Sequence, residues 1–338
     1  MQSIEQFYPL LQKPFKAIIT AHQKPDGDAM GSSLALYHFL IQLGHDVTVV
    51  SPTNWAPFLD WMPGIDKVVD YEGNRAKAAA LIQAADYIFC LDFNILHRTK
   101  NMESVIRDAK AVKILVDHHQ QPDTPSFGYG ISDVKMSSTC EMIYDIIVQS
   151  GHSNLINLDI ATALYTGLMT DTGSFRFPST TASVHKIVAH LKEVGLQHST
   201  IHENIYDQSS EGRLKFMGNA FLNRMHVFPE FKTAVMAIPK TDIYKFELKT
   251  GDTEGLVNYL LSIHGIKFAA IVIDREEERK WSFRSKGNFD VNIFARTHFE
   301  GGGHANAAGG SSKKSVDETF QDFKNILETY KSQLTQLN

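Results

Sequence analysis

Acidic and imidazole side chains occur at four separate places along this chain, each at the end of an expected strand or helix. They are His22, Asp26 and Asp28, then Asp92, then Asp117, His118 and His119, and finally Asp171. A single Asp at a strand end usually forms a turn or caps a helix. If parallel strands bring all four places to one edge of a sheet, five carboxylates and three imidazoles converge. So many like charges in a small volume require cations.

The donor atoms at these places are oxygen and nitrogen, with no thiolate. This set argues against a structural zinc site and suits Mn²⁺, with Mg²⁺, Co²⁺ or Fe²⁺ as alternatives. Two ions sharing a bridging carboxylate would hold the attacking and leaving oxygens of a phosphoryl hydrolysis without a protein nucleophile. The sequence has no nucleophile elbow, Walker loop or Rossmann glycine fingerprint. The indicated chemistry is therefore metal-dependent phosphate hydrolysis.

The first half of the chain alternates expected strands with expected helices. Apolar runs predict strands over residues 17–20, 47–50, 68–69, 87–91 and 112–116. Helical spacing predicts helices over residues 29–43, 76–85, 138–149, 159–170 and 181–194, and a short amphipathic helix before residue 13. This order predicts an α/β domain with a doubly wound, mainly parallel sheet.

The second half has a different pattern, which predicts a smaller α+β domain. Strand-like runs lie at residues 232–238, 268–273 and 281–284, and helices are expected near residues 255–263 and 316–334. We expect a first domain over residues 1–195, a helical linker over 196–213 and a second domain over 214–338.

The second domain carries a candidate phosphate site. Its glycine run, Gly301–Gly303, would let backbone N–H groups approach an anion closely. We expect His304 and the small residues after it to open a helix, whose N-terminus would add to the site. Arg284 can bind phosphate bidentately, and the hydroxyls of Ser282 and Ser285 add donors.

Composition bounds the class of protein. The chain has 338 residues, 43% of them hydrophobic, and a net charge of −5, which makes long duplex nucleic acid a poor candidate partner. Cys90 and Cys140 lie in apolar contexts and are expected to be buried thiols. The N-terminus lacks signal-peptide features and no apolar run is long enough for a membrane span, so we expect a cytoplasmic protein. The sequence leaves open whether it forms a homodimer.

Together the motifs resemble those of the DHH phosphoesterase family: His22-x3-Asp26-x-Asp28, Asp92, Asp117-His118-His119 and Asp171-Thr172-Gly173. The resemblance implies two metal ions. It assigns His22 and Asp26 to one ion, Asp28, His118 and Asp171 to the other, and Asp92 to both as a bridge.

The resemblance also implies roles around the ions. Asp117 would orient the histidine rings. His119 would face the scissile phosphate as a hydrogen-bond donor or general acid, although a structural histidine is the alternative. Arg98 would act in the active site, although an ordinary surface ion pair is the alternative.

The second half resembles the C-terminal domain associated with this family, through its S-x-R-S and G-G-G-H-x-x-A-A-G patterns. The resemblance implies an active site in the cleft between the domains. It also implies substrate binding by residues of both patterns, namely Ser282, Arg284, Ser285, Gly302, Gly303 and His304. One departure is Glu300, where the family often has glycine.

The resemblance covers about residues 15–312 and leaves no expected nucleic-acid-binding, sensory or membrane module. It favours the compact branch of the family, which hydrolyses short oligoribonucleotides, linear dinucleotides and adenosine 3′,5′-bisphosphate (pAp). Cyclic dinucleotide phosphodiesterase activity is the alternative within the same chemistry. A non-enzymatic nucleotide sensor would have lost metal ligands, whereas every expected ligand is present.

Overall fold

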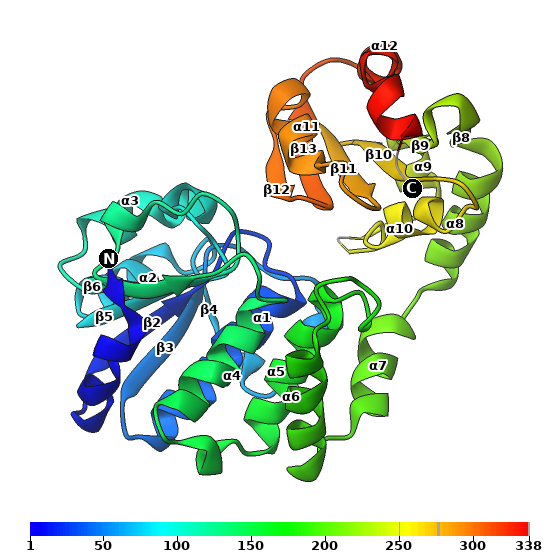
Figure 1. The fold of residues 1–338 in the computed structure, drawn as a ribbon. Helices are drawn as coiled ribbons and strands as arrows, with labels where there is room; N and C mark the ends of the chain where they lie inside the picture. The colour runs from blue at the N-terminus through cyan, green and yellow to red at the C-terminus, as the bar shows by residue number, and fades with distance from the viewer. Residues whose placement is uncertain (250, 276–277, 337–338) are drawn as a thin grey trace. The chain divides into compact units, whose positions relative to one another are not determined.

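The computed structural model describes residues 1–249, 251–275 and 278–336. The chain forms two compact units, Met1–Gln208 and Ser209–Asn338 (Figure 1). Helices α7 (His198–Tyr206) and α8 (Glu211–Asn223) flank the boundary between them. Within the described residues, no helix combines the length and the apolar character needed to span a membrane.

The first unit is built on a seven-stranded sheet in which every neighbouring pair of strands is parallel. In spatial order the strands are β1 (Gln2–Ser3), β7 (Tyr129–Ser132), β6 (Val112–Asp117), β5 (Tyr87–Leu91), β2 (Lys16–Thr20), β3 (Asp46–Ser51) and β4 (Val69–Asp70). The parallel α/β fold expected from the sequence is confirmed, and the short strands β1 and β7 are additions to it.

Helices cover both faces of this sheet because successive strand residues point to opposite sides (Figure 1). Ile19 and Phe89 join one apolar core, and Ile18 and Ile88 join the other. The first core includes residues of α1 (Gly27–Gln42), α4 (Thr139–Gln149), α5 (Leu158–Asp171) and α6 (Ala182–Glu193). The second includes residues of α2 (Arg75–Gln83) and α3 (Glu103–Asp108). Burial on both faces explains the uninterrupted apolar runs of the strands.

The start of the chain differs from the expected amphipathic helix. After β1 it forms two short 3₁₀ helices, η1 (Ile4–Gln6) and η2 (Tyr8–Gln12). Pro9 has no N–H to continue a helix from the preceding turn. Phe7 is buried at the junction, with its ring against those of Phe15, Tyr87, Phe89 and Tyr129. Further 3₁₀ turns are η3 (Pro57–Leu59), η4 (Ile65–Lys67), η5 (Leu96–Met102), η6 (Thr124–Ser126), η7 (Ser153–Leu155) and η8 (Pro229–Phe231).

The second unit is an α+β domain with a six-stranded sheet, as expected. Its strands in spatial order are β12 (Gly302–His304), β13 (Ala307–Ser312), β11 (Arg279–Ser285), β10 (Phe268–Asp274), β9 (Thr233–Ile238) and β8 (Met225–Phe228). Only β9 and β10 pair in parallel among these described strands. The remaining helices are α9 (Lys240–Lys245), α10 (Leu256–Leu261), α11 (Val291–His298) and α12 (Val316–Thr335). A core rich in aromatic rings includes Trp281, Phe283 and Phe323.

The expectation that His304 opens a helix is wrong. The glycine run enters β12, which pairs antiparallel with β13, so the small residues build a hairpin. A Cβ added at Gly301 would lie 2.0 Å from the carbonyl oxygen of Gly309, which explains why this position has no side chain. Glu300, just before the run, has a φ of 45°. This left-handed backbone favours glycine over residues with a side chain.

Candidate metal centre

Three neighbouring strands of the first unit end at one edge of the sheet, and each is followed by a predicted metal ligand. His22 lies two residues after β2, Asp92 directly follows β5, and His118 directly follows β6. The N–H of Asp92 donates to the carbonyl of Val116 at 3.0 Å, and Asp92 has a φ of 60°. A non-glycine residue rarely adopts this conformation, and such residues cluster at functional sites. The parallel sheet thus brings together residues that lie far apart in the sequence.

Two helices add the remaining predicted carboxylates. Asp26 caps α1, with Oδ1 accepting from the N–H groups of Asp28 (3.0 Å) and Ala29 (3.1 Å). Asp28 follows in the first turn, and Asp171 is the last residue of α5. A Cβ added at Gly167 of α5 would lie 2.6 Å from Oδ1 of Asp28, so glycine permits the close packing of the two helices.

The two oxygens of Asp92 face different imidazoles. Its Oδ2 lies 3.4 Å from Nε2 of His22, and its Oδ1 lies 3.4 Å from Nε2 of His118. The donor atoms form two overlapping triads, one of His22, Asp26 and Asp92 and the other of Asp28, Asp92 and His118, each within 4.8 Å. Asp171 Oδ2 lies 3.3 Å from His118 Nε2, which adds a further carboxylate to the second triad. The six predicted metal ligands therefore converge, with Asp92 common to both groups.

The histidine orientations suit metal binding. Nδ1 of His22 lies 2.8 Å from the carbonyl oxygen of Gln23, and Nδ1 of His118 lies 3.3 Å from that of Met136. Hydrogen bonds at these nitrogens place the proton on Nδ1 and leave the Nε2 lone pairs directed toward the carboxylates. Lone pairs facing carboxylate oxygens repel unless a cation or a proton lies between them. The donor set therefore fits divalent ions.

The electrostatics of the carboxylates lead to the same conclusion. Burial and then the charge of Asp92 raise the pKa of Asp28 to about 7. Burial and then the charge of Asp28 raise the pKa of Asp171 well above its ordinary value. Burial would also raise the pKa of Asp92, but when no ion is bound the protonated rings of His118 and His22 donate to it from Nε2 and hold that pKa well below its usual range. The site concentrates negative charge that two divalent ions would neutralise.

The N-terminus of α4 supports Asp28 in a way that the sequence did not reveal. The backbone N–H groups of Thr139 and Cys140 donate to its two oxygens at 2.7 and 2.9 Å. The hydroxyl of Thr139 also lies 3.2 Å from Oδ1 of Asp92. Residues 138–141 indicated only the start of a helix, and Ser138 does cap α4. The predicted thiols are both buried and free, and burial raises the pKa of Cys140, which argues against a thiolate ligand.

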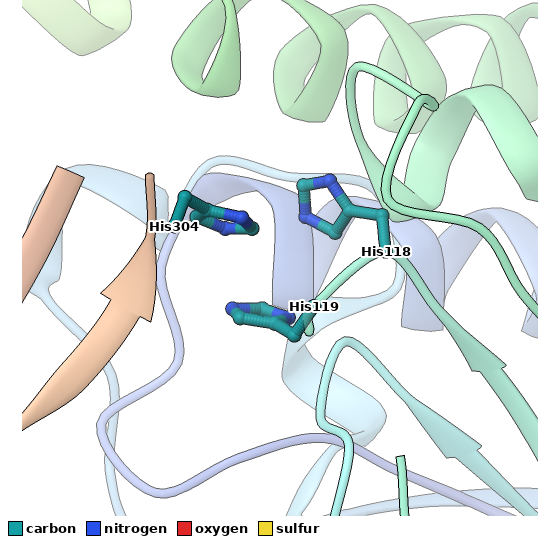
Figure 2. Close-up of side chains that lie close together, drawn as sticks. All are labelled: His118, His119 and His304. Carbon is teal, nitrogen blue, oxygen red and sulfur yellow. The ribbon is translucent and has the colours of Figure 1, made fainter. Parts of the chain in front are cut away.

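Asp117 and His119 lie beside this cluster. Nδ1 of His119 donates to Oδ1 of Asp117 at 2.7 Å, and Asp117 is fully buried. Figure 2 shows the neighbouring rings of His118 and His119, whose centroids are 5.0 Å apart. Burial lowers the pKa of His119, which favours the neutral ring at neutral pH. With Nδ1 protonated, its Nε2 accepts a hydrogen bond when the ring is neutral and donates when it is charged.

Arg98 also lies near the cluster. Its Nη1 is 3.4 Å from the carbonyl oxygen of Asp92, and its own carbonyl accepts from the N–H of Gln23 at 3.0 Å. Burial, and to a smaller extent the positive charge of Arg98, lower the pKa of His119. The guanidinium is thus placed where it can act on an anion at the metal centre.

The predicted phosphate-binding residues of the second unit lie on one stretch of its sheet. Arg284 on β11 and His304 on β12 are both paired with Ala307 of the intervening strand β13. Ser282 lies two residues before Arg284 and shares its face of the sheet. Ser285 lies on the other face, where its buried hydroxyl donates to the carbonyl of Phe289 at 2.6 Å.

Two further contacts define this stretch. Asn306, in the turn between β12 and β13, donates to the hydroxyl of Ser285 at 2.8 Å. The N–H of Gly303 donates to Oδ1 of Asn292 at 3.0 Å, and Gly302 precedes it on β12. Ser285 and Gly303 therefore have internal contacts that stabilise the hairpin.

Comparison with known proteins agrees with this architecture. Residues 16–168 match the DHH family, N-terminal domain, and residues 232–334 match the DHHA1 domain. The bifunctional oligoribonuclease and PAP phosphatase NrnA of Bacillus subtilis is 27% identical over 320 residues, 93% of this chain and 95% of that protein. NrnA of Thermus thermophilus is 28% identical over 319 residues, 94% of this chain and 90% of that protein.

A solved structure is similar over the whole chain. The crystal structure of an exopolyphosphatase-related protein from Bacteroides fragilis has a TM-score of 0.94 and 37% identity, covering 98% of this chain and 97% of that chain. This protein therefore belongs to the DHH family of phosphoesterases, with a DHH domain followed by a DHHA1 domain.

Proposed function

We propose that this protein is a Mn²⁺-dependent phosphohydrolase that degrades short oligoribonucleotides, including linear dinucleotides, and dephosphorylates pAp. The observation that carries the proposal is the position of Asp92, whose two oxygens face His22 and His118 at 3.4 Å each. A carboxylate shared by two donor groups suits a pair of divalent ions. The substrate class is supported by the NrnA relatives, which are named bifunctional oligoribonuclease and PAP phosphatase.

We assign one set of ligands to each ion. His22 and Asp26 would hold the first, Asp28, His118 and Asp171 the second, and Asp92 both. When bound, two such ions would neutralise phosphate charge and lower the pKa of water, which would make hydroxide available as the nucleophile at neutral pH. The oxygen and nitrogen donors accept Mn²⁺, and also Mg²⁺ or Co²⁺.

The chain's own groups then bind and orient the substrate. Asp117 fixes the ring of His119 by the 2.7 Å hydrogen bond at Nδ1. We propose that the negative charge of a bound phosphate favours the protonated ring of His119, which then donates from Nε2 to the leaving oxygen. Arg98 would stabilise charge on the phosphate that is attacked.

We assign metal chemistry to the first unit and substrate binding to the second. Arg284, with Ser282 and His304, would bind a phosphate, sugar or base remote from the scissile bond. With both cysteines buried as free thiols, we also propose a cytoplasmic location.

The test is hydrolysis of a matched substrate panel. Protein stripped with EDTA and reloaded with Mn²⁺ is assayed on pAp, pApA, an RNA of a few nucleotides, a much longer single-stranded RNA, cyclic di-AMP and pyrophosphate. The proposal expects turnover of pAp and the short linear RNAs only, and no turnover before metal is restored. Dominant hydrolysis of cyclic di-AMP would assign the cyclic dinucleotide class instead. Activity confined to the long RNA or pyrophosphate would contradict the proposal.

A further inference from the structure

The segment that follows Asp171 has an unusual backbone. Gly173, Ser174 and Phe175 have successive φ values of 57°, 61° and 63°. Left-handed conformations are uncommon for residues other than glycine, and they persist only where the surrounding structure holds them. Two such residues in succession lie three and four positions after the predicted metal ligand Asp171. They indicate that the surrounding structure holds this segment in a defined position.

Hydrogen bonds to Thr172 hold the segment in place. Its hydroxyl accepts from the N–H of Phe175 at 3.0 Å. Its carbonyl accepts from the N–H groups of Arg176 and Phe177 at 3.0 Å each. The ring of Phe177 lies so close to Gly173 that an added Cβ would be 2.4 Å from it. The segment therefore presents the side chains of Phe175 and Arg176 in a fixed position.

Aromatic and imidazole rings continue from this segment to α7. The ring of Phe175 lies 5.5 Å from that of Tyr165, and the Tyr165 hydroxyl is hydrogen-bonded to Nε2 of His202 at 3.1 Å. The rings of His202 and Tyr206 lie 5.8 Å apart, one helical turn apart on α7. Tyr165 is buried, whereas Tyr206 is 43% exposed. The row thus begins in the core and ends at the surface.

Arg176 adds a positive charge to the exposed end of this row. Its Nε donates to the carbonyl of Gly173 at 2.7 Å, and the residue is exposed. Burial raises the pKa of the Tyr206 hydroxyl, and the charge of Arg176 acts against that rise. Burial, and then His198, lower the pKa of His202, so its ring is neutral at neutral pH.

Along the chain, this row follows the end of α5 that carries the predicted metal ligand Asp171. Phe175 lies four residues after Asp171, whose Oδ2 is 3.3 Å from Nε2 of His118. Thr170, the residue before Asp171, packs against Gly27 at the start of α1. A Cβ added at Gly27 would lie 2.5 Å from Oγ1 of Thr170. The strained segment therefore starts at the end of α5 that contacts the metal-binding end of α1.

We propose that Phe175, Arg176, His202 and Tyr206 form a nucleobase-binding surface for the nucleotide next to the scissile phosphate. Tyr206 and Arg176 are exposed, and Phe175 and His202 are half-buried. Aromatic, imidazole and guanidinium planes can stack on every type of base, which gives affinity without a strong sequence preference. Arg176 would in addition attract the phosphate backbone. Tyr165 acts as a positioning residue through its hydrogen bond to His202. The inference rests on the proposed function because it assumes a nucleotide substrate.

The kinetic test compares a dinucleotide with its analogue in which the base next to the scissile phosphate is missing. Tyr206→Ala and Arg176→Ala are each expected to raise KM for the complete dinucleotide by about 10-fold, with kcat changed less than about threefold. Tyr206→Ala should not alter KM for the abasic analogue, whereas Arg176→Ala should raise that KM less than the KM for the complete dinucleotide, because the analogue keeps its phosphates but lacks the base. Tyr206→Phe, which keeps the ring, should behave as the unaltered protein. Tyr259→Ala and Lys77→Ala are controls, since these residues are also exposed but lie on other helices, α10 and α2.

A binding test separates this inference from the proposed function. Calorimetry with Mn²⁺-loaded protein compares AMP with ribose 5-phosphate, and Tyr206→Ala should abolish the preference for AMP. The substrate panel could show no nucleotide hydrolysis while the protein still prefers AMP to ribose 5-phosphate in a way that depends on Tyr206. That result would support the nucleobase-binding surface and contradict the proposed function. Equal effects of Tyr206→Ala on complete and abasic ligands, in protein with unchanged thermal stability, would overturn the surface.

Discussion

The imidazole of His119 donates through Nδ1 to Oδ1 of Asp117 at 2.7 Å. Asp117 is fully buried, and among the described residues its Oδ2 has no hydrogen-bond partner. Burying a carboxylate with so few hydrogen bonds costs folding free energy. This cost indicates that Asp117 has a role in orienting its neighbour. The pair therefore fixes which nitrogen of His119 is available beside the metal centre.

Replacing Asp117 tests this relationship. Asp117→Ala is expected to lower kcat about 10- to 100-fold, the range found when a group that orients an active-site histidine is lost. Steady-state kinetics on pAp measures this loss. Asp133→Asn is the control, since the Asp133 side chain accepts from the nearby N–H of Lys135 at 2.9 Å and an amide oxygen can do the same. Unchanged kcat in Asp117→Ala would contradict the role of the pair.

The shared position of Asp92 predicts unequal effects of replacing metal ligands. Asp92→Asn should weaken both ions and lower turnover by more than about 100-fold, because even residues that only support ligands cost up to that factor. Asp26→Asn should remove one ion and leave the second triad occupied. Calorimetric stoichiometry and the spin coupling of Mn²⁺ pairs measure the difference. Two tightly bound ions in Asp92→Asn would refute the bridging assignment.

The raised pKa of Asp171 predicts that the metal-free protein loses folding stability as the pH rises. Burial and Asp28 raise this pKa in the folded state, so folding favours the protonated form. The resulting stabilisation exists at low pH and is lost as pH rises through the raised pKa. At pH above that value, metal-free Asp171→Asn should therefore melt about 2–4 °C higher than the unaltered protein.

Saturating Mn²⁺ should reverse this order, because ions that bind only the folded state stabilise it and the variant has lost a ligand. Thermal melts with EDTA and with Mn²⁺ measure both effects. Asp133→Asn serves again as the control, since it also removes one negative charge. A lower melting temperature of Asp171→Asn under both conditions would show that this carboxylate is not strained in the metal-free site.

Gly167 tests the packing that positions Asp28. A Cβ added there would lie 2.2 Å from Sγ of Cys140 and 2.6 Å from Oδ1 of Asp28. Gly167→Ala should therefore destabilise the fold by about 1–3 kcal/mol. Gly218→Ala is a matched control, since Gly218 lies within α8 and an added Cβ there would contact none of the described atoms. It should be neutral or stabilising by up to about 1 kcal/mol. Equal melting temperatures of the two variants would contradict this account.

Arg284 tests the assignment of substrate binding to the second unit. Arg284→Ala should raise KM for pAp about 10-fold, as expected for the loss of one charge-assisted contact to phosphate, with kcat little changed. Arg279→Ala on the same strand is the control, because Arg279 is paired with Asp274 at 3.0 Å. An unchanged KM for pAp in Arg284→Ala would show that this arginine does not bind substrate.

Many helices and strands could be predicted from the sequence, because their positions follow from the local periodicity of apolar residues. Uninterrupted apolar runs identified β2, β5 and β6, and helical spacing identified α1, α4 and α5 to within about two residues. Alternation of these elements predicts parallel strands, and the residues directly after parallel strands gather at one edge of the sheet. The convergence of His22, Asp92 and His118 was therefore predictable from their places at strand ends.

The remaining features follow only from the tertiary structure, because they depend on which distant segments of the chain pair or pack together. The sequence of Gly301–Gly310 suits a phosphate loop or a hairpin, and the pairing of β13 with β11 selects the hairpin. The N–H groups of Thr139 and Cys140 reach Asp28, more than 100 residues away, because α4 packs against α1. The row from Phe175 to Tyr206 likewise exists only because α7 lies against α5. Spacing along the chain reports local periodicity, whereas these contacts arise from packing between distant elements.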